Sequence, residues 1–110
     1  MKFLEKYEAT QLDDGSVLFE KTPVENYSEI FVCANKVNDV YTIFDGGSTL
    51  SALNMIYNFS SPEFLEKFIG ICQQKRISKK DNVLFVECYE QDFEQRLNDF
   101  VEALNMICEI

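Results

Sequence analysis

The sequence contains no histidine and no tryptophan. Histidine is the side chain that most often titrates near neutral pH, so its absence excludes Ser-His and Cys-His nucleophile pairs and removes the commonest general base. It also leaves only cysteine thiolates for a zinc site, and no two cysteines have the two-residue spacing of a metal-binding pair. We therefore expect a protein that is not an enzyme, with no catalytic residue, no metal and no cofactor.

Long apolar runs are also absent. A membrane helix needs about 20 consecutive apolar residues, and no stretch approaches this length; residues 1–6 also lack the apolar centre of a signal peptide. The cysteines lie within apolar stretches, which favours buried and reduced thiols over disulfides. They are Cys33, Cys72, Cys88 and Cys108. These features predict a soluble cytoplasmic protein that does not bind membranes.

The chain has few basic residues for its acidic content. Ten Lys and Arg stand against 19 Asp and Glu, which gives a formal net charge of −9. This charge repels nucleic-acid phosphates and attracts proteins with basic surfaces. The basic cluster comprises Lys75, Arg76, Lys79 and Lys80. Such a cluster is typical of cations at a helix C-terminus followed by a solvated loop, and a nucleic-acid-binding regulator that acts through it is the alternative.

Hydrophobic residues are abundant: they make up 46% of the sequence and include ten Phe and five Tyr. A chain of 110 residues with this composition can build one core, so we expect a single domain over residues 1–110. Runs of β-branched and aromatic residues predict strands, and short connections between the first three favour antiparallel pairing. The predicted strands are 17–22, 30–34, 40–44 and 83–89, with a polar loop at 35–39.

The sharpest local pattern is the stretch 40–53, in which a strand meets an Asp-Gly-Gly turn and then a helix. The glycines permit positive φ, and Ser48 or Thr49 is predicted to cap a helix from about Thr49 to Asn58. Glycine amides before a helix also suit a bound phosphate. Because Asp45 brings negative charge to the same place, we favour a structural corner over an anion site.

Three further segments have apolar residues at helical spacing. Residues 1–8 predict a short N-terminal helix; a second helix begins with Ser61 as N-cap and Pro62 at its first position; a third begins at a capping box of Asp92 and Gln95. The second helix is expected to bury Phe64, Leu65, Phe68, Ile69, Ile71 and Cys72. The third is expected to bury Phe93, Leu97, Phe100, Val101, Leu104, Ile107 and Cys108. These elements predict an α+β fold: an antiparallel sheet of three to five strands with three main helices packed on one face.

Part of the chain resembles a known family. Thr22-Pro23, Ile30-Phe31-Val32 and the stretch 40–50 are similar to the family of domains of unknown function numbered 1828, whose members tend to show a Thr-Pro, a strand and a leucine-threonine-Asp-x-Gly corner before a helix. Here Ile43-Phe44 precedes Asp45 instead. The family comprises small bacterial and phage proteins without established chemistry. The resemblance therefore implies a phage or mobile-element setting and carries over no catalytic residue.

Acidity and the implied phage setting together favour an inhibitor of a host nucleic-acid-handling or defence protein, such as a CRISPR nuclease. The inhibitor would occupy a basic groove with carboxylates or block it sterically, without contacting nucleic acid itself. The predicted partner-binding residues are Glu87, Glu90, Glu94, Asp99, Glu102, Met106 and Glu109. Met106 and Ile110 are the candidates for a homodimer contact, because both lie off the apolar stripe. The alternative is a metal-dependent phosphoester hydrolase that uses Asp13, Asp14 or Asp45.

Overall fold

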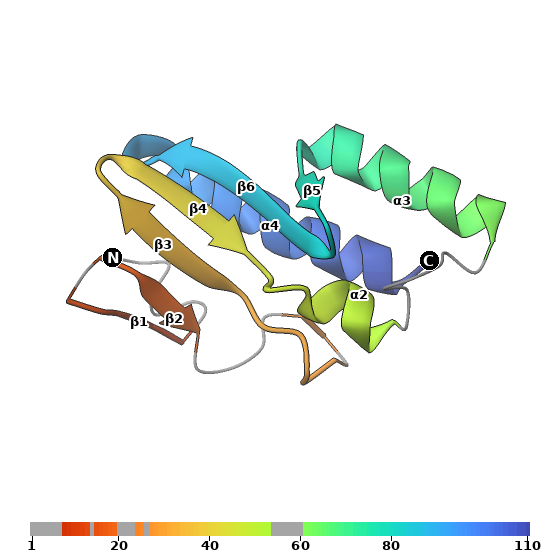
Figure 1. The fold of residues 1–110 in the computed structure, drawn as a ribbon, viewed down its shortest axis with the longest axis horizontal. Coiled ribbons are helices and arrows are strands. Elements are labelled where there is room, and N and C mark those ends of the chain that lie inside the picture. Colours follow the sequence, from red (N-terminus) through yellow and green to blue (C-terminus); the bar gives the residue numbers. More distant parts are fainter. Residues whose placement is uncertain (1–7, 14, 20–23, 26, 54–60) are drawn as a thin grey trace.

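Six β-strands form one antiparallel sheet in a computed structural model of the chain, which describes residues 8–13, 15–19, 24–25, 27–53 and 61–110 (Figure 1). The strands are β1 (Ala9–Gln11), β2 (Val17–Phe19), β3 (Cys33–Val37), β4 (Val40–Phe44), β5 (Ser78–Lys80) and β6 (Val83–Tyr89). Their order across the sheet is β1-β2-β3-β4-β6-β5, and every neighbouring pair is antiparallel. The predicted α+β class and antiparallel sheet are confirmed, whereas the predicted number of three to five strands is lower than the six observed.

Strands β4 and β6 have the predicted bounds, but β3 does not. It begins at Cys33 rather than Ile30 and continues to Val37 through most of the predicted loop. The turn to β4 is only Asn38-Asp39, and Asn38 has a φ of 57°. A two-residue hairpin requires this left-handed conformation, and asparagine tolerates it. The sequence prediction placed a longer loop here because the last residues of β3 are mostly polar. Of the predicted strand 17–22, residues 20–22 lie outside the described part of the chain.

The two strands missing from the sequence prediction, β1 and β5, are the outer strands of the sheet. Both have three residues and carry polar side chains such as Thr10 and Lys79. Edge strands are partly solvated and often polar, so they lack the apolar pattern on which strand prediction depends. In β5, Ser78 pairs with Phe85 and Lys80 pairs with Val83. The predicted solvated loop at 78–80 is therefore a strand.

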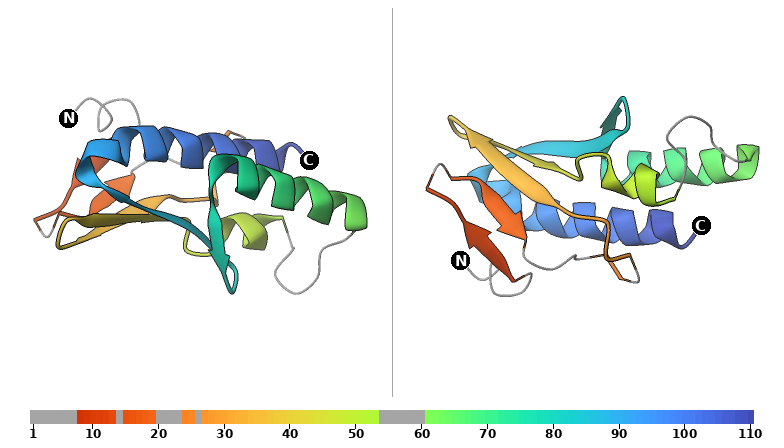
Figure 2. Two further views of the ribbon diagram at one scale, coloured as in Figure 1. Left: turned by 90° about the horizontal axis from the view of Figure 1, so that it is seen from above. Right: turned by 60° about the horizontal axis from the view of Figure 1, so that its bottom comes forward.

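Two long helices, α3 (Pro62–Lys75) and α4 (Phe93–Cys108), lie on the same side of the sheet. Figure 2 shows α4 running along the sheet with α3 beside it. The third helix, α2 (Ser48–Ala52), has only five residues, so the prediction of three main helices is wrong. The predicted end of α2, residues 54–58, lies outside the described residues, as does most of the predicted N-terminal helix, residues 1–7. No helix in the described ranges is long and apolar enough to cross a membrane.

Helix α4 supplies one side of the core. Its buried residues include six of the seven that the sequence predicts, and Cys108 is partly buried. They face the sheet residues Tyr41, Ile43, Leu84 and Val86, which are at most 2% exposed. Tyr41 and Phe93 meet with ring centroids 4.5 Å apart. Burial of a large apolar side chain contributes roughly 1.5–3 kcal/mol, so this contact between α4 and the sheet is the main source of stability.

Helix α3 buries much less than its sequence predicts. Ser61 caps its N-terminus by accepting a hydrogen bond from the Phe64 amide at 3.1 Å, as predicted, but Phe68 is its one buried residue. Leu65 and Ile69 are 36% and 45% exposed. The predicted buried face is therefore only partly buried: Phe64, Ile71 and Cys72 pack against the core without being fully covered, because α4 already occupies the sheet.

The start of α4 also differs from its prediction. A 3₁₀ turn, η1 (Glu90–Asp92), leads directly into the helix, and no side chain caps it. Instead of completing a capping box, Gln95 donates a hydrogen bond to Asp99 at 3.0 Å. The helical turn before Phe93 places Asp92 in a helical conformation, with φ −102° and ψ 0°. A capping box needs an extended N-cap residue, so the predicted pair cannot form here.

Candidate protein-binding surfaces

The corner after β4 is held together by the buried carboxylate of Asp45. Its oxygens accept hydrogen bonds from the amides of Gly47 (2.9 Å), Thr49 (3.3 Å) and Leu84 (3.0 Å). The first two of these amides belong to the start of α2, so Asp45 does the capping that was predicted for Ser48 or Thr49. Ser48 instead donates to the Asp45 carbonyl at 2.6 Å. The carboxylate also occupies the amides that a phosphate would use, which supports the structural corner.

Two of the carboxylates proposed for a hydrolase, Asp13 and Asp45, do not come together. Asp45 is fully buried and its oxygens are used by amides, whereas Asp13 is exposed in the β1–β2 connection. That connection lies beside Asn35 and Lys36, at the opposite end of β4 from Asp45. Asp14 lies outside the described residues. Within the described ranges, no group of three or more His, Cys, Asp or Glu side chains is placed to hold a metal ion.

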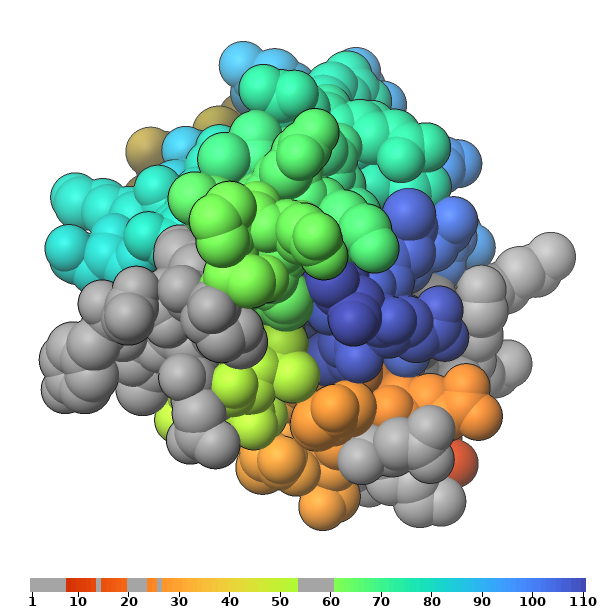
Figure 3. All heavy atoms as spheres, turned by 90° about the vertical axis from the view of Figure 1, so that its right-hand side faces the viewer, coloured from red at the N-terminus to blue at the C-terminus, as the bar shows by residue number. Residues whose placement is uncertain are grey.

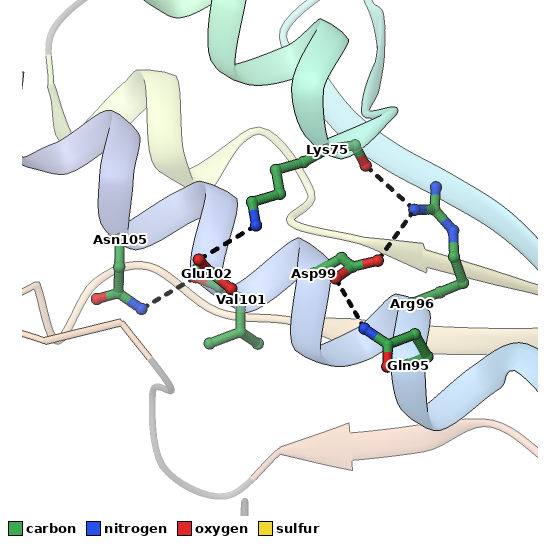
Figure 4. A network of polar contacts seen from close by, with 7 residues as sticks. All are labelled: Lys75, Gln95, Arg96, Asp99, Val101, Glu102 and Asn105. Carbon is green, nitrogen blue, oxygen red and sulfur yellow. Dashed lines mark hydrogen bonds and ion pairs between the residues drawn. The ribbon is translucent and has the colours of Figure 1, made fainter.

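Two of the predicted partner-binding acids already form ion pairs: Glu102 pairs with a residue of α3, and Asp99 pairs with a residue of α4 itself (Figure 4). Lys75 Nζ lies 3.1 Å from Glu102 Oε1, and Arg96 Nη1 lies 3.5 Å from Asp99 Oδ2. The Arg96 guanidinium also donates to the main-chain oxygens of Lys75 (3.1 Å) and Arg76 (2.8 Å). These contacts tie the C-terminal end of α3 to α4. They offset part of the charge that was expected to meet a partner.

The remaining predicted residues are spread over separate surfaces. Glu90 and Glu94 are exposed at the start of α4 and Glu109 at its end. Met106 is partly buried and shares a groove with residues of α3. Figure 3 shows the end of the molecule at which α3 and the C-terminal part of α4 lie side by side. Glu87 projects from the side of the sheet opposite α4. The structure therefore does not assemble one acidic surface from the seven residues.

The predicted homodimer residues line a shallow groove between α3 and α4. Its volume is about 500 Å³. The lining residues are Lys67, Gly70, Ile71, Gln74, Met106, Glu109 and Ile110. Ile110 is 38% exposed and Met106 is partly buried. This small groove brings the two suspected residues together, but a homodimer stays a prediction.

The basic cluster is divided between two places. Lys75 pairs with Glu102, and Arg76 ends α3 with a φ of 55°. Lys79 and Lys80 lie on β5, where all three residues are exposed. The prediction of cations at a helix C-terminus is confirmed for Lys75, which lies in the last turn of α3. The four residues form no continuous nucleic-acid groove.

The sheet has a second face, which carries large apolar side chains and which no described helix covers. Register places Leu18 beside Cys33, Phe44 beside Phe85, and Thr42 beside Glu87 on this face. We call it the open face; Figure 1 looks onto it. Its residues are Thr10, Leu18, Cys33, Asn35, Val37, Val40, Thr42, Phe44, Ser78, Lys80, Val83, Phe85, Glu87 and Tyr89. Most of them are apolar, so the sheet can bury surface on both sides.

Three apolar residues of the open face are strongly exposed: Leu18 by 48%, Val37 by 69% and Tyr89 by 59%. Near the centre a depression of about 350 Å³ is floored by apolar and aromatic residues. It is lined by Asn35, Thr42, Phe44, Lys80, Asp81, Val83 and Phe85. The sequence contained a signal for this face, because β4 and β6 are apolar at successive positions rather than at alternate ones.

All four cysteines are free thiols and partly buried, consistent with the predicted reduced state. Burial raises the pKa of Cys72 and of Cys108 to about 11, although Lys79 opposes the shift at Cys72. Glu29 and Glu109 add to the shift at Cys108. Burial also raises the pKa of Cys33 and Cys88. These thiols therefore stay protonated at neutral pH, unlike the low-pKa thiolates of cysteine nucleophiles.

Comparison with known proteins adds no relative to these observations: no family model, curated protein or solved structure matches the chain. The resemblance described above stays an expectation.

Proposed function

We propose that this protein is a non-enzymatic binding domain that inhibits a basic host protein by docking through the open face. The observation that carries the proposal is a sheet face that no described helix covers, on which Leu18, Val37 and Tyr89 are exposed and Phe44 and Phe85 line a depression. Val37 and Tyr89 flank Val40 at one end of this face, Leu18 lies at the other end, and exposed apolar surface of this kind marks protein contacts. Burial of such residues supplies affinity, whereas surface charge mainly steers the encounter.

The charge around the open face supports a basic partner. Glu87 projects from the face itself, and Asp39 and Asp81 are exposed in the turns at its two ends. Lys80 is the basic residue of the depression. The formal charge of −9 acts in the same direction over longer distances and raises the rate of association with a basic surface. Two copies of the chain would repel each other through the same carboxylates.

The implied phage setting makes a host nucleic-acid-handling or defence protein, such as a CRISPR nuclease, the proposed target in the host cytoplasm. Such proteins have basic grooves for nucleic acid. Occupation of such a groove by an acidic domain would block nucleic acid without a catalytic step. Two acids of α4, Asp99 and Glu102, are paired with basic residues, so this helix presents less free negative charge. We therefore favour docking through the apolar residues of the open face over charge mimicry by α4 alone.

The first test is an affinity capture of the tagged protein from host lysate, with and without nuclease treatment. A stoichiometric, nuclease-insensitive partner that is basic supports the proposal. In that complex, Leu18→Ser with Val37→Ser should weaken binding at least about tenfold, the typical effect of truncating buried anchors. The matched control is Leu65→Ser with Ile69→Ser, which changes two exposed apolar residues of α3 and should leave affinity within about twofold.

A second comparison tests the surface that the sequence favoured. Glu94→Lys with Glu109→Lys reverses two exposed charges on α4 and at its end, and should lower affinity only through the weaker long-range attraction, which added salt screens. If this pair abolishes binding at high salt while the Leu18 and Val37 pair has no effect, the acidic helix rather than the open face is the docking surface.

A further inference from the structure

Strand β6 is longer than its outer neighbour, which leaves part of its edge unpaired. β5 reaches only to Phe85, where it pairs through Ser78. From Val86 to Tyr89, no described strand lies on that side of β6. Such an edge offers main-chain groups to another strand.

The hydrogen-bonding direction along β6 can be assigned from its contact with the corner. The Asp45 amide donates to the Leu84 carbonyl at 3.2 Å, and the Leu84 amide donates to the Asp45 side chain. Main-chain groups alternate sides along an antiparallel strand, so those of Leu84, Val86 and Cys88 point toward β4. The N–H and C=O groups of Glu87 and the N–H of Tyr89 therefore point outward, away from β4, whereas the Tyr89 carbonyl begins the 3₁₀ turn η1.

A cleft of about 620 Å³ lies beside this edge and provides room for an added chain. It is lined by Val40, Arg76, Glu87, Cys88, Tyr89, Asp92, Gln95 and Arg96. Arg96 is already held by Asp99 and by two main-chain oxygens. Besides the strand residues, the residues that line the cleft come from the end of α3 and the first turn of α4.

The side chains around the edge differ on its two sides. Glu87 and Tyr89 lie on the open face, and the exposed Glu90 follows them. On the other side the cleft holds Arg76, Arg96 and Asp92. An added strand alternates its own side chains between these two environments. Basic residues fit beside Glu87, and small polar residues fit toward the cleft.

We propose that the edge of β6 from Val86 to Tyr89 binds an extended basic segment of the partner as an additional β-strand. This inference rests on the proposed function for its partner but concerns a different surface from the centre of the open face. Strand addition of this kind gains affinity from main-chain hydrogen bonds and specificity from alternate side chains. Charge complementarity with Glu87 and Glu90 selects a basic segment over a second copy of this acidic chain.

The test uses a synthetic octapeptide of alternating threonine and lysine as the probe, with amide NMR spectra and hydrogen exchange of the whole protein. The octapeptide should shift the amide signals of Glu87 and Tyr89 and slow their exchange about tenfold. A peptide of alternating threonine and glutamate should do neither. If the basic octapeptide leaves both amides unchanged, or if they become protected with rising protein concentration alone, the proposal is wrong.

Two substitutions of one residue isolate the main-chain contact. Tyr89 has a φ of −83°, which proline can adopt, so Tyr89→Pro removes the outward N–H with little strain. Tyr89→Ala removes the same ring and keeps the N–H. Strand addition requires that the proline variant bind the octapeptide at least about fivefold more weakly than the alanine variant, because a hydrogen bond is lost. Equal affinities would overturn the main-chain contact.

The charge contribution is tested separately. Glu87→Lys should weaken octapeptide binding, whereas Glu66→Lys, which makes the same change on α3, should not. If both substitutions weaken octapeptide binding equally, the attraction is nonspecific and the assigned site is wrong. A captured partner that binds the Tyr89→Pro and Tyr89→Ala variants equally well would remove strand addition while leaving the proposed function intact.

Discussion

The two faces of the sheet have similar apolar content but different surroundings. On the face that α4 covers, Ile43 and Leu84 are 0% exposed. On the open face, Leu18 is 48% exposed, and Phe44 and Phe85 are only partly buried. The first face stabilises the fold, and the second retains apolar surface that a partner can bury. The same residue types therefore contribute to stability on one face and, in the function we propose, to binding on the other, according to what lies above them.

The largest expected effect is at the corner that joins the sheet to α2. Asp45→Ala would leave the amides of Gly47, Thr49 and Leu84 without their acceptor, and the hydrogen bonds of Thr49 and Leu84 are buried. Each unsatisfied group costs roughly 1–3 kcal/mol. We expect a loss of about 5 kcal/mol, enough to unfold a domain of ordinary stability. Chemical denaturation followed by circular dichroism measures it. Asp45→Asn keeps one acceptor oxygen and should lose less; equal losses would contradict this account.

Phe68→Asp tests whether the helix layer over the covered face depends on α3. Phe68 is 3% exposed and stacks on Phe64 with ring centroids 6.2 Å apart. Replacing it with a carboxylate removes this packing and buries a charge, so we expect a destabilisation of about 4 kcal/mol. The matched control is Ile69→Asp, which places the same charge at a position 45% exposed and should cost less than about 1 kcal/mol. Unchanged thermal stability in the Phe68 variant would show that α3 is dispensable.

The direct comparison of the two faces uses one substitution on each. Leu84→Ala truncates a fully buried side chain on the covered face and should cost about 3 kcal/mol, whereas Leu18→Ala on the open face should cost less than about 1 kcal/mol. Urea unfolding curves of both variants give the two free energies of unfolding. Similar losses would mean that the open face also contributes to the core.

The smallest expected effect concerns the thiols. With a pKa of about 11, Cys72 and Cys108 should react with iodoacetamide at pH 8 about 100-fold more slowly than a thiol of ordinary pKa. Because the folded state keeps these protons while the unfolded chain releases them above about pH 9, their contribution to stability should be lost as pH rises toward about 11. Mass spectrometry of alkylated cysteines in the folded protein and in urea measures the reactivity; equal rates would show that the thiols are not protected.

The two long helices show how far sequence patterns could predict the fold. In both, apolar residues recur at helical spacing, yet α4 buries seven residues and α3 only Phe68. Periodicity indicates which face of a helix can be buried. Which of the two helices is buried against the sheet depends on how they are placed in the fold, and α4 takes that position. The sequence already shows the acids of α4, and the pairing of Asp99 with Arg96 three residues earlier is local, but the pairing of Glu102 with Lys75 depends on α3 lying alongside.

The sequence by itself determined the local elements whose causes are local: strands β4 and β6, the turn at Gly46 and Gly47, the Ser61 cap and the apolar stripe of α4. It also determined the acidity of the chain. Tertiary structure alone decided that Asp45 bridges to Leu84 on a distant strand, that polar segments become the edge strands β1 and β5, and that both described long helices lie on one face of the sheet. These features depend on contacts between residues far apart in the chain, for which no periodicity or turn motif gives a signal.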